Sequence, residues 1–396
     1  MNQEGKRIVE DALEVAREAL LKLSHDIHSN PELGFEEHKA AQWQVEFLKE
    51  RGFTVEIPYC GLATAYRASR SFGSGKPRIA FMAEYDALAG AGHACGHNII
   101  ASSALGAGIA LAQALSEAKV DGEVLVIGTP GEEGQGGKVH LVEKGAFDDV
   151  DFALMMHPST QNVIGRGALA AQGVTARYRG RAVHSASPEK GINALTSLIA
   201  LFNGIDALRQ VWPDTGRCNG IVTSGGTASN IVPELAEGRF TVRAGTKLEL
   251  TAMVEGIRRA AQSAAALTGA ELTFETAPLF AERYPNMTMG ERFKVHLEEQ
   301  GESVMYPNPK ARVGSSDVGN VSMVVPTIHD YVSIAAETVL GHTDEFREAA
   351  KSPRADKVVL LAAQALALTG WDLATDEALR AQARKEFEEN AAPNRC

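Results

Sequence analysis

The chain has 396 residues, of which 44% are hydrophobic and 22% charged, and its formal net charge is −11. A single hydrophobic core rarely organises more than about 250–300 residues, so this length predicts two domains. The acidic balance, without any basic stripe, predicts that neither nucleic acid nor a membrane surface is a partner.

The N-terminal segment 1–23 carries charged residues throughout, so it lacks the apolar centre of a signal peptide. No later stretch offers about 18 consecutive apolar residues for a membrane span. In a chain without an export signal, widely separated cysteines favour reduced thiols over a disulfide framework. We therefore expect a cytoplasmic protein with thiols available for metal binding or catalysis, at Cys60, Cys95, Cys218 and Cys396.

Apolar residues at helical spacing from Ile8 to Leu23 predict an opening amphipathic helix. Three apolar runs follow, at residues 79–83, 124–128 and 151–156, and the first two lead into glycine-containing loops and then helical patterns. Strand, loop and helix repeating in this order predict an α/β domain. Its sheet is expected to be mostly parallel, with helices on both faces.

After Gly167 the pattern changes to that of a smaller α+β unit. The expected elements are a strand near 174–178, a helix at 195–208, strands near 221 and 240, a helix at 253–267 and a strand at 272–274. This β-α-β-β-α-β order is typical of a ferredoxin-like domain. We expect it to be inserted into the larger domain.

The larger domain is thus predicted to be discontinuous. Residues 1–168 form its first part, residues 169–280 form the inserted domain, and residues 281–396 form its second part. This second part is expected to contain a helix near 291–299, an apolar strand near 324–334 and a final helix at 356–368.

The densest polar cluster is Gly92-His93-Ala94-Cys95-Gly96-His97-Asn98, between a strand and a helix rich in small residues. A thiolate and an imidazole two residues apart in extended backbone project to the same side. Cys95 and His97 can therefore reach one metal centre or two adjacent ones. A buried cysteine near a helix start, with hydrogen-bonded histidines beside it, explains the segment equally well.

Glu132 and Glu133 follow the second apolar run, where ligands of open α/β sheets bind, outside the carboxyl ends of the strands. Adjacent carboxylates repel each other unless a cation lies nearby, so one can bind metal while the other accepts a proton. A solvated acidic turn is the alternative. His157 ends the third run and points to the same edge, although a lone histidine is more often structural.

At this point the sequence resembles the M20 metallopeptidases, and more narrowly their amidohydrolase branch. That branch includes aminoacylases, aminobenzoyl-glutamate hydrolases and dipeptidases like M20 domain-containing protein 2. The resemblance runs in order from about His25 to His342. The similar segments are His25–Glu37, Ala83–His97, Thr129–Gly134, His157-Pro158, Arg181–Ser185, Gly225–Glu234 and Gly314–Ser322.

The resemblance implies a site with two divalent metal ions, for which Zn²⁺ is the expected ion and Mn²⁺ or Co²⁺ the alternatives. It implies Glu132 as the general base, and Asp86 behind the ligands, where it orients one of them. The implied metal ligands are Cys95, His97, Glu133, His157 and His342.

Three further candidates lie in the inserted domain, which the resemblance implies to be a lid and a dimerisation domain. His184 is similar to a family histidine that reaches into the active site, commonly that of the partner subunit of a homodimer. Asn230 is similar to a lid residue that meets the backbone or carboxylate of the substrate. Arg243 is a candidate for binding a substrate carboxylate, with surface or interdomain pairing as the alternative.

The implied activity is hydrolysis of the amide bond of small N-acyl or aminoacyl amino acids, of the dipeptide or aminobenzoyl-glutamate type. A metal-bridged water would attack, with Glu132 as general base. Asn98 and Ala89 depart from the Asp and Pro of many members. The rival hypotheses are a non-catalytic binding protein of the same fold and a nucleotide-dependent enzyme. The loop Gly131–Gly137 is glycine-rich but lacks GxGxxG spacing, and its glutamates would repel a pyrophosphate.

Overall fold

A computed structural model describes residues 3–308 and 313–394 of the chain. The protein divides into two compact units. The first comprises Met1–Gly167, Arg283–Val313 and Asp317–Cys396, and the second comprises Ala168–Glu282 with Gly314–Ser316. The short piece Gly314–Ser316 thus belongs to the second unit, whereas the sequence pattern placed it in the larger domain.

The first unit is built on a six-stranded sheet of order β1-β2-β4-β3-β5-β10. Its strands are β1 (Thr54–Glu56), β2 (Tyr66–Phe72), β3 (Arg78–Ala83), β4 (Gly122–Gly128), β5 (Phe152–Ser159) and β10 (Thr327–Ser333). The last four are parallel, which confirms the mostly parallel α/β sheet. β1 and β2, which were not expected from the sequence, form an antiparallel edge.

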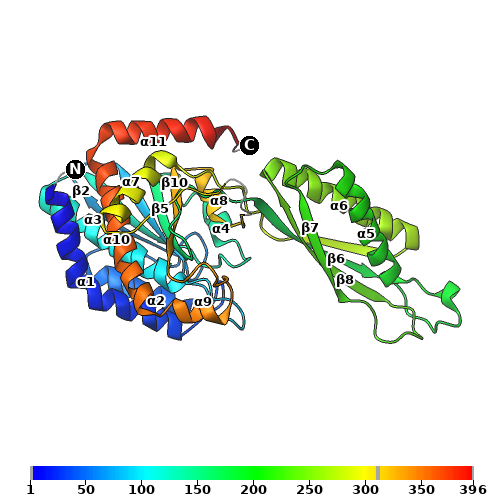
Figure 1. Cartoon of the computed structure of the whole chain (residues 1–396). Helices are drawn as coiled ribbons and strands as arrows, with labels where there is room; N and C mark the ends of the chain where they lie inside the picture. The colour runs from blue at the N-terminus through cyan, green and yellow to red at the C-terminus, as the bar shows by residue number, and fades with distance from the viewer. Residues whose placement is uncertain (1–2, 309–312, 395–396) are drawn as a thin grey trace. The chain divides into compact units, whose positions relative to one another are not determined.

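Helices cover both faces of this sheet, because the side chains on both faces of β3 are apolar and must be buried. Ile79 and Phe81 belong to one buried cluster, while Ala80 and Met82 belong to another. Figure 1 shows α1, α3 and α10 packed together over the sheet. The helices of this unit are α1 (Gln3–Ser29), α2 (His38–Glu50), α3 (His97–Ala118), α4 (Gly137–Glu143), α7 (Met287–Glu299), α8 (Val318–Ser322), α9 (Asp344–Ala349), α10 (Pro353–Thr375) and α11 (Glu377–Asn390).

α3 and α10 are long and apolar enough to cross a membrane by length and composition alone, but 89% and 83% of their apolar windows are buried inside the protein. They pack closely because small residues face each other. A Cβ on Gly106 would lie only 2.9 Å from the Cβ of Ala363. The apolar character of both helices is therefore explained by burial. α11 follows α10, so the helix expected at 356–368 is not the last one.

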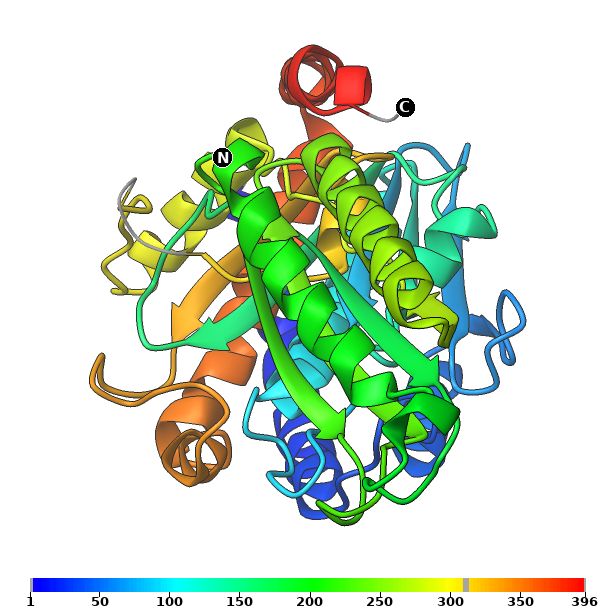
Figure 2. The same ribbon diagram turned by 90° about the vertical axis from the view of Figure 1, so that its right-hand side faces the viewer.

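The second unit has an antiparallel sheet of order β7-β8-β6-β9, and α5 and α6 lie side by side on one face of it (Figure 2). Its elements are β6 (Ala170–Arg179), α5 (Ala194–Leu208), β7 (Arg217–Ser224), β8 (Leu235–Ala244), α6 (Lys247–Thr268) and β9 (Glu271–Thr276). The chain order and the strand order together are those of a ferredoxin-like fold. A capping box between Thr246 and Glu249 starts α6.

Candidate metal centre

Three parallel strands deliver four of the five predicted metal ligands to one edge of the first sheet. Cys95 and His97 lie where the connection from β3 enters α3, Glu133 follows β4, and His157 lies within β5 near its end. His342 comes from the loop before α9, and its backbone N–H donates to the carbonyl of Ala94 at 3.0 Å. The carboxyl ends of parallel strands meet at the same edge, so this convergence follows from the sheet topology.

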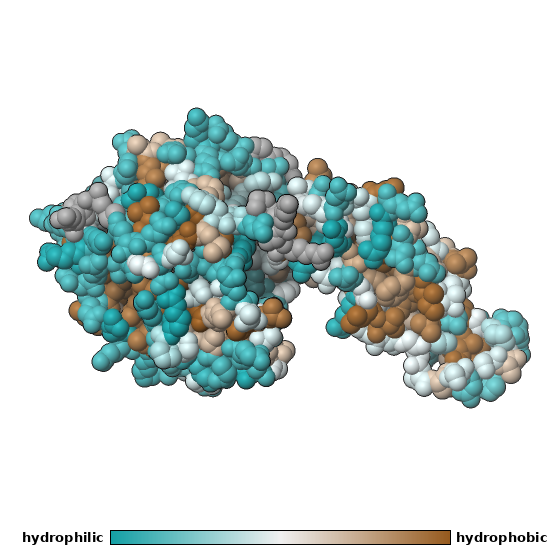
Figure 3. Space-filling model, viewed as in Figure 1, coloured by the Kyte–Doolittle hydropathy of each residue, from teal (hydrophilic) through white to brown (hydrophobic). Residues whose placement is uncertain are grey.

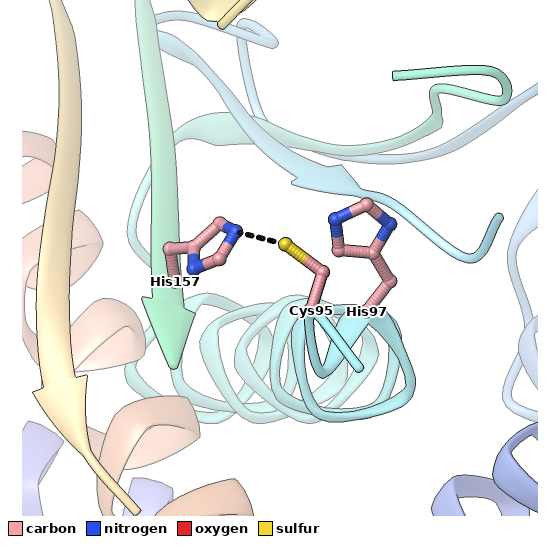
Figure 4. Close-up of side chains that lie close together, drawn as sticks. All are labelled: Cys95, His97 and His157. Carbon is pink, nitrogen blue, oxygen red and sulfur yellow. Dashed lines mark hydrogen bonds between the residues drawn. The ribbon is translucent and has the colours of Figure 1, made fainter. Parts of the chain in front are cut away.

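Gly96 allows the Cys95–His97 segment to lie directly against the end of β5. It caps the start of α3 with φ of 78°, in the left-handed region. A Cβ on Gly96 would also lie 2.6 Å from Cγ of Pro158. Glycine meets both requirements, and as a result Cys95 faces His157 across this contact (Figure 4).

The five predicted ligands form two groups of three that share Cys95, and within each group the donor atoms lie close together. The Cys95 sulfur lies 3.7 Å from Nε2 of His157 and 3.6 Å from Nε2 of His342. Oε1 of Glu133 lies 3.9 Å from Nε2 of both His97 and His342. Donor atoms within 4.8 Å of one another form two overlapping groups: Cys95, His97 and His157, and Cys95, Glu133 and His342.

Hydrogen bonds on the far side of two imidazoles fix which nitrogen faces the cluster. Nδ1 of His97 donates to the carbonyl of Asp86 at 2.9 Å and to its carboxylate at 3.0 Å. Nδ1 of His157 donates to the carbonyl of Pro158 at 2.7 Å. Both Nε2 atoms therefore face the cluster. Nε2 of His97 and Oε1 of Glu133 are buried without a hydrogen bond among the described residues, which fits a cation between them.

Burial and charge set the protonation state from which these groups would bind a cation. Burial raises the pKa of the Cys95 thiol to about 12 and lowers the pKa of His157 to about 4. Burial opposes the charged form of His97, but Asp86 and Cys95 together outweigh this effect and raise the pKa of His97. A divalent cation favours the thiolate and the neutral imidazole. Thiolate, imidazole and carboxylate donors together suit a zinc-like ion.

Asp86 connects two of the converging loops. One carboxylate oxygen accepts the His97 bond and the other accepts the backbone N–H of Glu133 at 2.9 Å. The residue is 1% exposed, so water competes little for these bonds. This is the position behind the ligands that the family resemblance implies for Asp86.

Glu132 is half-buried beside the donor cluster. A carboxylate oxygen of Glu132 lies within 4.8 Å of ligand atoms of both His97 and Glu133. The carboxylates of Glu132, Glu84 and Asp317 likewise lie within 4.8 Å of one another. Burial, followed by repulsion from Glu84, Asp317 and Glu133, raises the pKa of Glu132 well above its usual value. A carboxyl group with a raised pKa is suited to accept and return a proton near neutral pH.

A buried ion-pair network behind Glu132 was not predicted. Nζ of Lys138 lies 2.6 Å from Glu84 and 2.8 Å from Asp317, and all three side chains are at most 1% exposed. The lysine ammonium thus occupies the space between two of the carboxylates that surround Glu132. Glu84 and Asp317 lie in segments that carry the family resemblance. The sequence does not show that these carboxylates are buried around Lys138.

The remaining predicted site residues lie in the second unit. His184 and Asn230 are exposed neighbours, since the N–H of Ser185 donates to the carbonyl of Asn230 at 2.9 Å. Nδ1 of His184 accepts the N–H of Ala186 at 3.1 Å. Arg243, in β8, donates to Oγ of Ser315 at 2.5 Å.

Asn98, one of the two departures from the family pattern, has a packing role. Its side-chain amide donates to Oγ of Ser24 at 2.9 Å and to the carbonyl of Ala350 at 3.0 Å. An ionised aspartate could not donate to a carbonyl, so this site favours asparagine. Nothing in the structure explains Ala89.

The fold and this donor cluster are those of an α/β metallopeptidase. Residues 80–364 match the family described as peptidase family M20/M25/M40, and the chain belongs to that family. The M20 resemblance seen in the sequence is therefore confirmed, and so is the expectation of an enzyme.

Two characterised kinds of hydrolase are similar to this protein over nearly the whole chain. Xaa-Arg dipeptidase of Mus musculus is 36% identical, over 96% of this chain and 92% of that protein. One of the p-aminobenzoyl-glutamate hydrolase subunits of Escherichia coli (strain K12) is 28% identical, over 100% of this chain and 97% of that protein. A Bacillus subtilis structure, described as a dinuclear metal binding peptidase of family M20, shares the fold. It has a TM-score of 0.62 at 20% identity and covers 90% of this chain and 99% of its own.

Proposed function

We propose that this protein hydrolyses the amide bond of small dipeptides or N-acyl amino acids with bound divalent metal ions. The observation that carries the proposal is the convergence of five metal-competent donors beside Glu132, the carboxylate that we propose as the general base. The names of the two relatives, a dipeptidase and an aminobenzoyl-glutamate hydrolase, support the substrate class.

In the proposed mechanism Cys95, His97, Glu133, His157 and His342 would hold two divalent ions, preferably Zn²⁺. When bound, such ions lower the pKa of a water molecule and polarise the scissile carbonyl. Glu132 removes the proton from the attacking water and delivers it to the leaving nitrogen. Asp86 keeps His97 and the Glu133 backbone in place during these transfers.

A substrate panel tests the proposed function. We expect hydrolysis of Xaa-Arg dipeptides, N-acyl amino acids or aminobenzoyl-glutamate, lost on chelation, with little activity on long peptides. Release of the free amine, followed by liquid chromatography, is the measurement. If no small amide is cleaved while one of them binds, the chain is a binding protein of this fold. Efficient cleavage of long peptides alone would contradict the proposed substrate class.

We further propose that the second unit supplies His184, Asn230 and Arg243 to substrate binding, and that it forms a homodimer in which His184 acts on the partner's site. His184 would donate a hydrogen bond to the developing oxyanion. Two observations support an interface on this unit. The first is that β7 is an edge strand in which Ile221 and Val222 are 63% and 52% exposed.

The second observation is that exposed apolar side chains gather on the second unit, where brown atoms form a patch in Figure 3. This unit holds eight of the fourteen large hydrophobic residues that are exposed in the described chain. Exposed apolar groups at an unpaired strand edge are typical of an association surface.

Mixing two inactive variants tests action across a dimer. His184→Ala and Glu132→Ala are each expected to lose activity, and a mixture that exchanges protomers should recover about a quarter of the wild-type rate. Random exchange gives half heterodimers, and one site of each heterodimer then combines an intact base with an intact histidine. Native mass spectrometry, with one variant labelled with ¹⁵N, confirms exchange. Inactive mixtures after verified exchange, or a strictly monomeric protein, would refute the trans assignment.

A further inference from the structure

The segment at residues 31–37, which the proposed mechanism leaves without a role, lies against both loops that carry the centre. The N–H of Ala87, next to Asp86, donates to the carbonyl of Glu32 at 2.8 Å. On the other side the segment touches the loop after β4. A Cβ on Gly34 would lie 2.9 Å from Cα of Gly131, so the two backbones are in direct contact.

Phe35 strengthens this contact at a cost in backbone energy. It is a non-glycine residue with φ of 68°, in the left-handed region that disfavours side chains. A Cβ on Gly131 would lie 2.8 Å from the Phe35 ring, so the ring packs directly on the glycine that precedes Glu132. Strained conformations of this kind persist where the surrounding structure fixes them and are frequent near functional sites.

Glu37 completes the contact with a buried carboxyl group. The residue is 0% exposed. Oε1 accepts the backbone N–H of Gly131 at 2.8 Å, and Oε2 accepts the hydroxyl of Thr64 at 2.9 Å. On the far side of Glu132, the backbone N–H of Glu133 donates to Asp86. The backbone on either side of Glu132 is therefore held by a buried carboxyl group.

We propose that Glu37 is a positioning residue that holds the Gly131–Glu133 backbone in place, and so sets the position of the base Glu132 and of the ligand Glu133. This inference rests on the proposed function. Burial, together with the Asp86 carboxylate, raises the pKa of Glu37 to about 7, so charging this group in the folded protein is unfavourable. A buried carboxyl with two directed hydrogen bonds is thus kept at a cost to stability, as expected for a residue that positions others.

Three variants separate positioning from simple packing. Glu37→Ala removes both hydrogen bonds. In Glu37→Gln the amide oxygen can still accept the Gly131 N–H while the amide nitrogen donates to Thr64, so both contacts survive. Thr64→Val is the matched control, because it removes a buried hydrogen bond of Glu37 but leaves the Gly131 contact.

The first readout is hydrogen exchange of the peptide covering residues 129–137, measured by mass spectrometry on the metal-free protein. We expect exchange about 10-fold faster in Glu37→Ala, as for the loss of one hydrogen bond, and near-normal exchange in Glu37→Gln and Thr64→Val. Unchanged exchange in folded Glu37→Ala, or equal acceleration in Thr64→Val, would overturn the proposal.

The second readout is the kinetics with saturating Zn²⁺ on the small-amide substrate. Glu37→Ala should lose roughly 10- to 100-fold in kcat with little change in KM, and Glu37→Gln should restore most of it. A purely structural role would lower the melting temperature of Glu37→Ala without changing kcat of the folded enzyme. If the wild type cleaves no amide, the proposed function fails, while the exchange measurement still decides the role of Glu37.

Discussion

Glu132→Gln is expected to reduce kcat for amide hydrolysis by about 10²–10⁴-fold or more, with metal content unchanged. Glutamine has nearly the same shape as glutamate but cannot accept a proton. The donor atoms of Glu132, His97 and Glu133 lie within 4.8 Å of one another, so Glu132 is close enough to bind metal, but the family resemblance implies a base at this position. The measurement is steady-state kinetics on a small amide substrate, paired with elemental analysis of the same preparation.

The matched control for this variant is Glu143→Gln, an exposed glutamate at the end of α4. It should retain normal turnover and normal metal content. Near-normal turnover in Glu132→Gln would place the base elsewhere. Loss of metal together with turnover would instead identify Glu132 as a ligand, and the proton acceptor would then have to be sought among the buried carboxylates behind it.

Much of the candidate metal centre could be predicted, because the ends of buried strands can be recognised in the sequence. The apolar runs that become β3, β4 and β5 are each bounded by polar residues, and a parallel sheet brings their carboxyl ends together. The family resemblance then singled out His342, which follows no strand end of its own. The backbone of His342 has a positive φ of 63°, and the sequence pattern gave no sign of that conformation.

The interior of the site could not be predicted, because burial is decided by tertiary packing. Lys138 reads as an ordinary lysine at a helix start, yet it is fully buried between Glu84 and Asp317. Gly96 reads as a loop glycine, yet it is fixed by its contact with Pro158. In both cases the partner is more than 50 residues away along the chain, where no local pattern can indicate it.

Metal removal is expected to abolish hydrolysis, and added Zn²⁺ is expected to restore it. The wild type should bind up to two divalent ions per chain. Cys95→Ser and His157→Ala should bind them more weakly, by more than the roughly 10–100-fold that loss of an outer hydrogen-bond partner costs. Elemental analysis after gel filtration measures occupancy, and competition with a chelator of known affinity measures the binding constant.

The pH dependence of binding provides an independent check. In the metal-free protein the Cys95 thiol has a pKa of about 12 and the pKa of His97 is raised, so both carry protons at neutral pH. Binding must release these protons, and the apparent affinity should therefore fall as the pH falls. Calorimetry in buffers of different ionisation enthalpy counts the released protons.

Cys60→Ser is the matched control for Cys95→Ser. Cys60 is a half-buried thiol outside the donor groups, so this variant should bind metal normally. Active enzyme without a transition metal, or equal metal loss in both cysteine variants, would contradict the assignment of Cys95 to the centre.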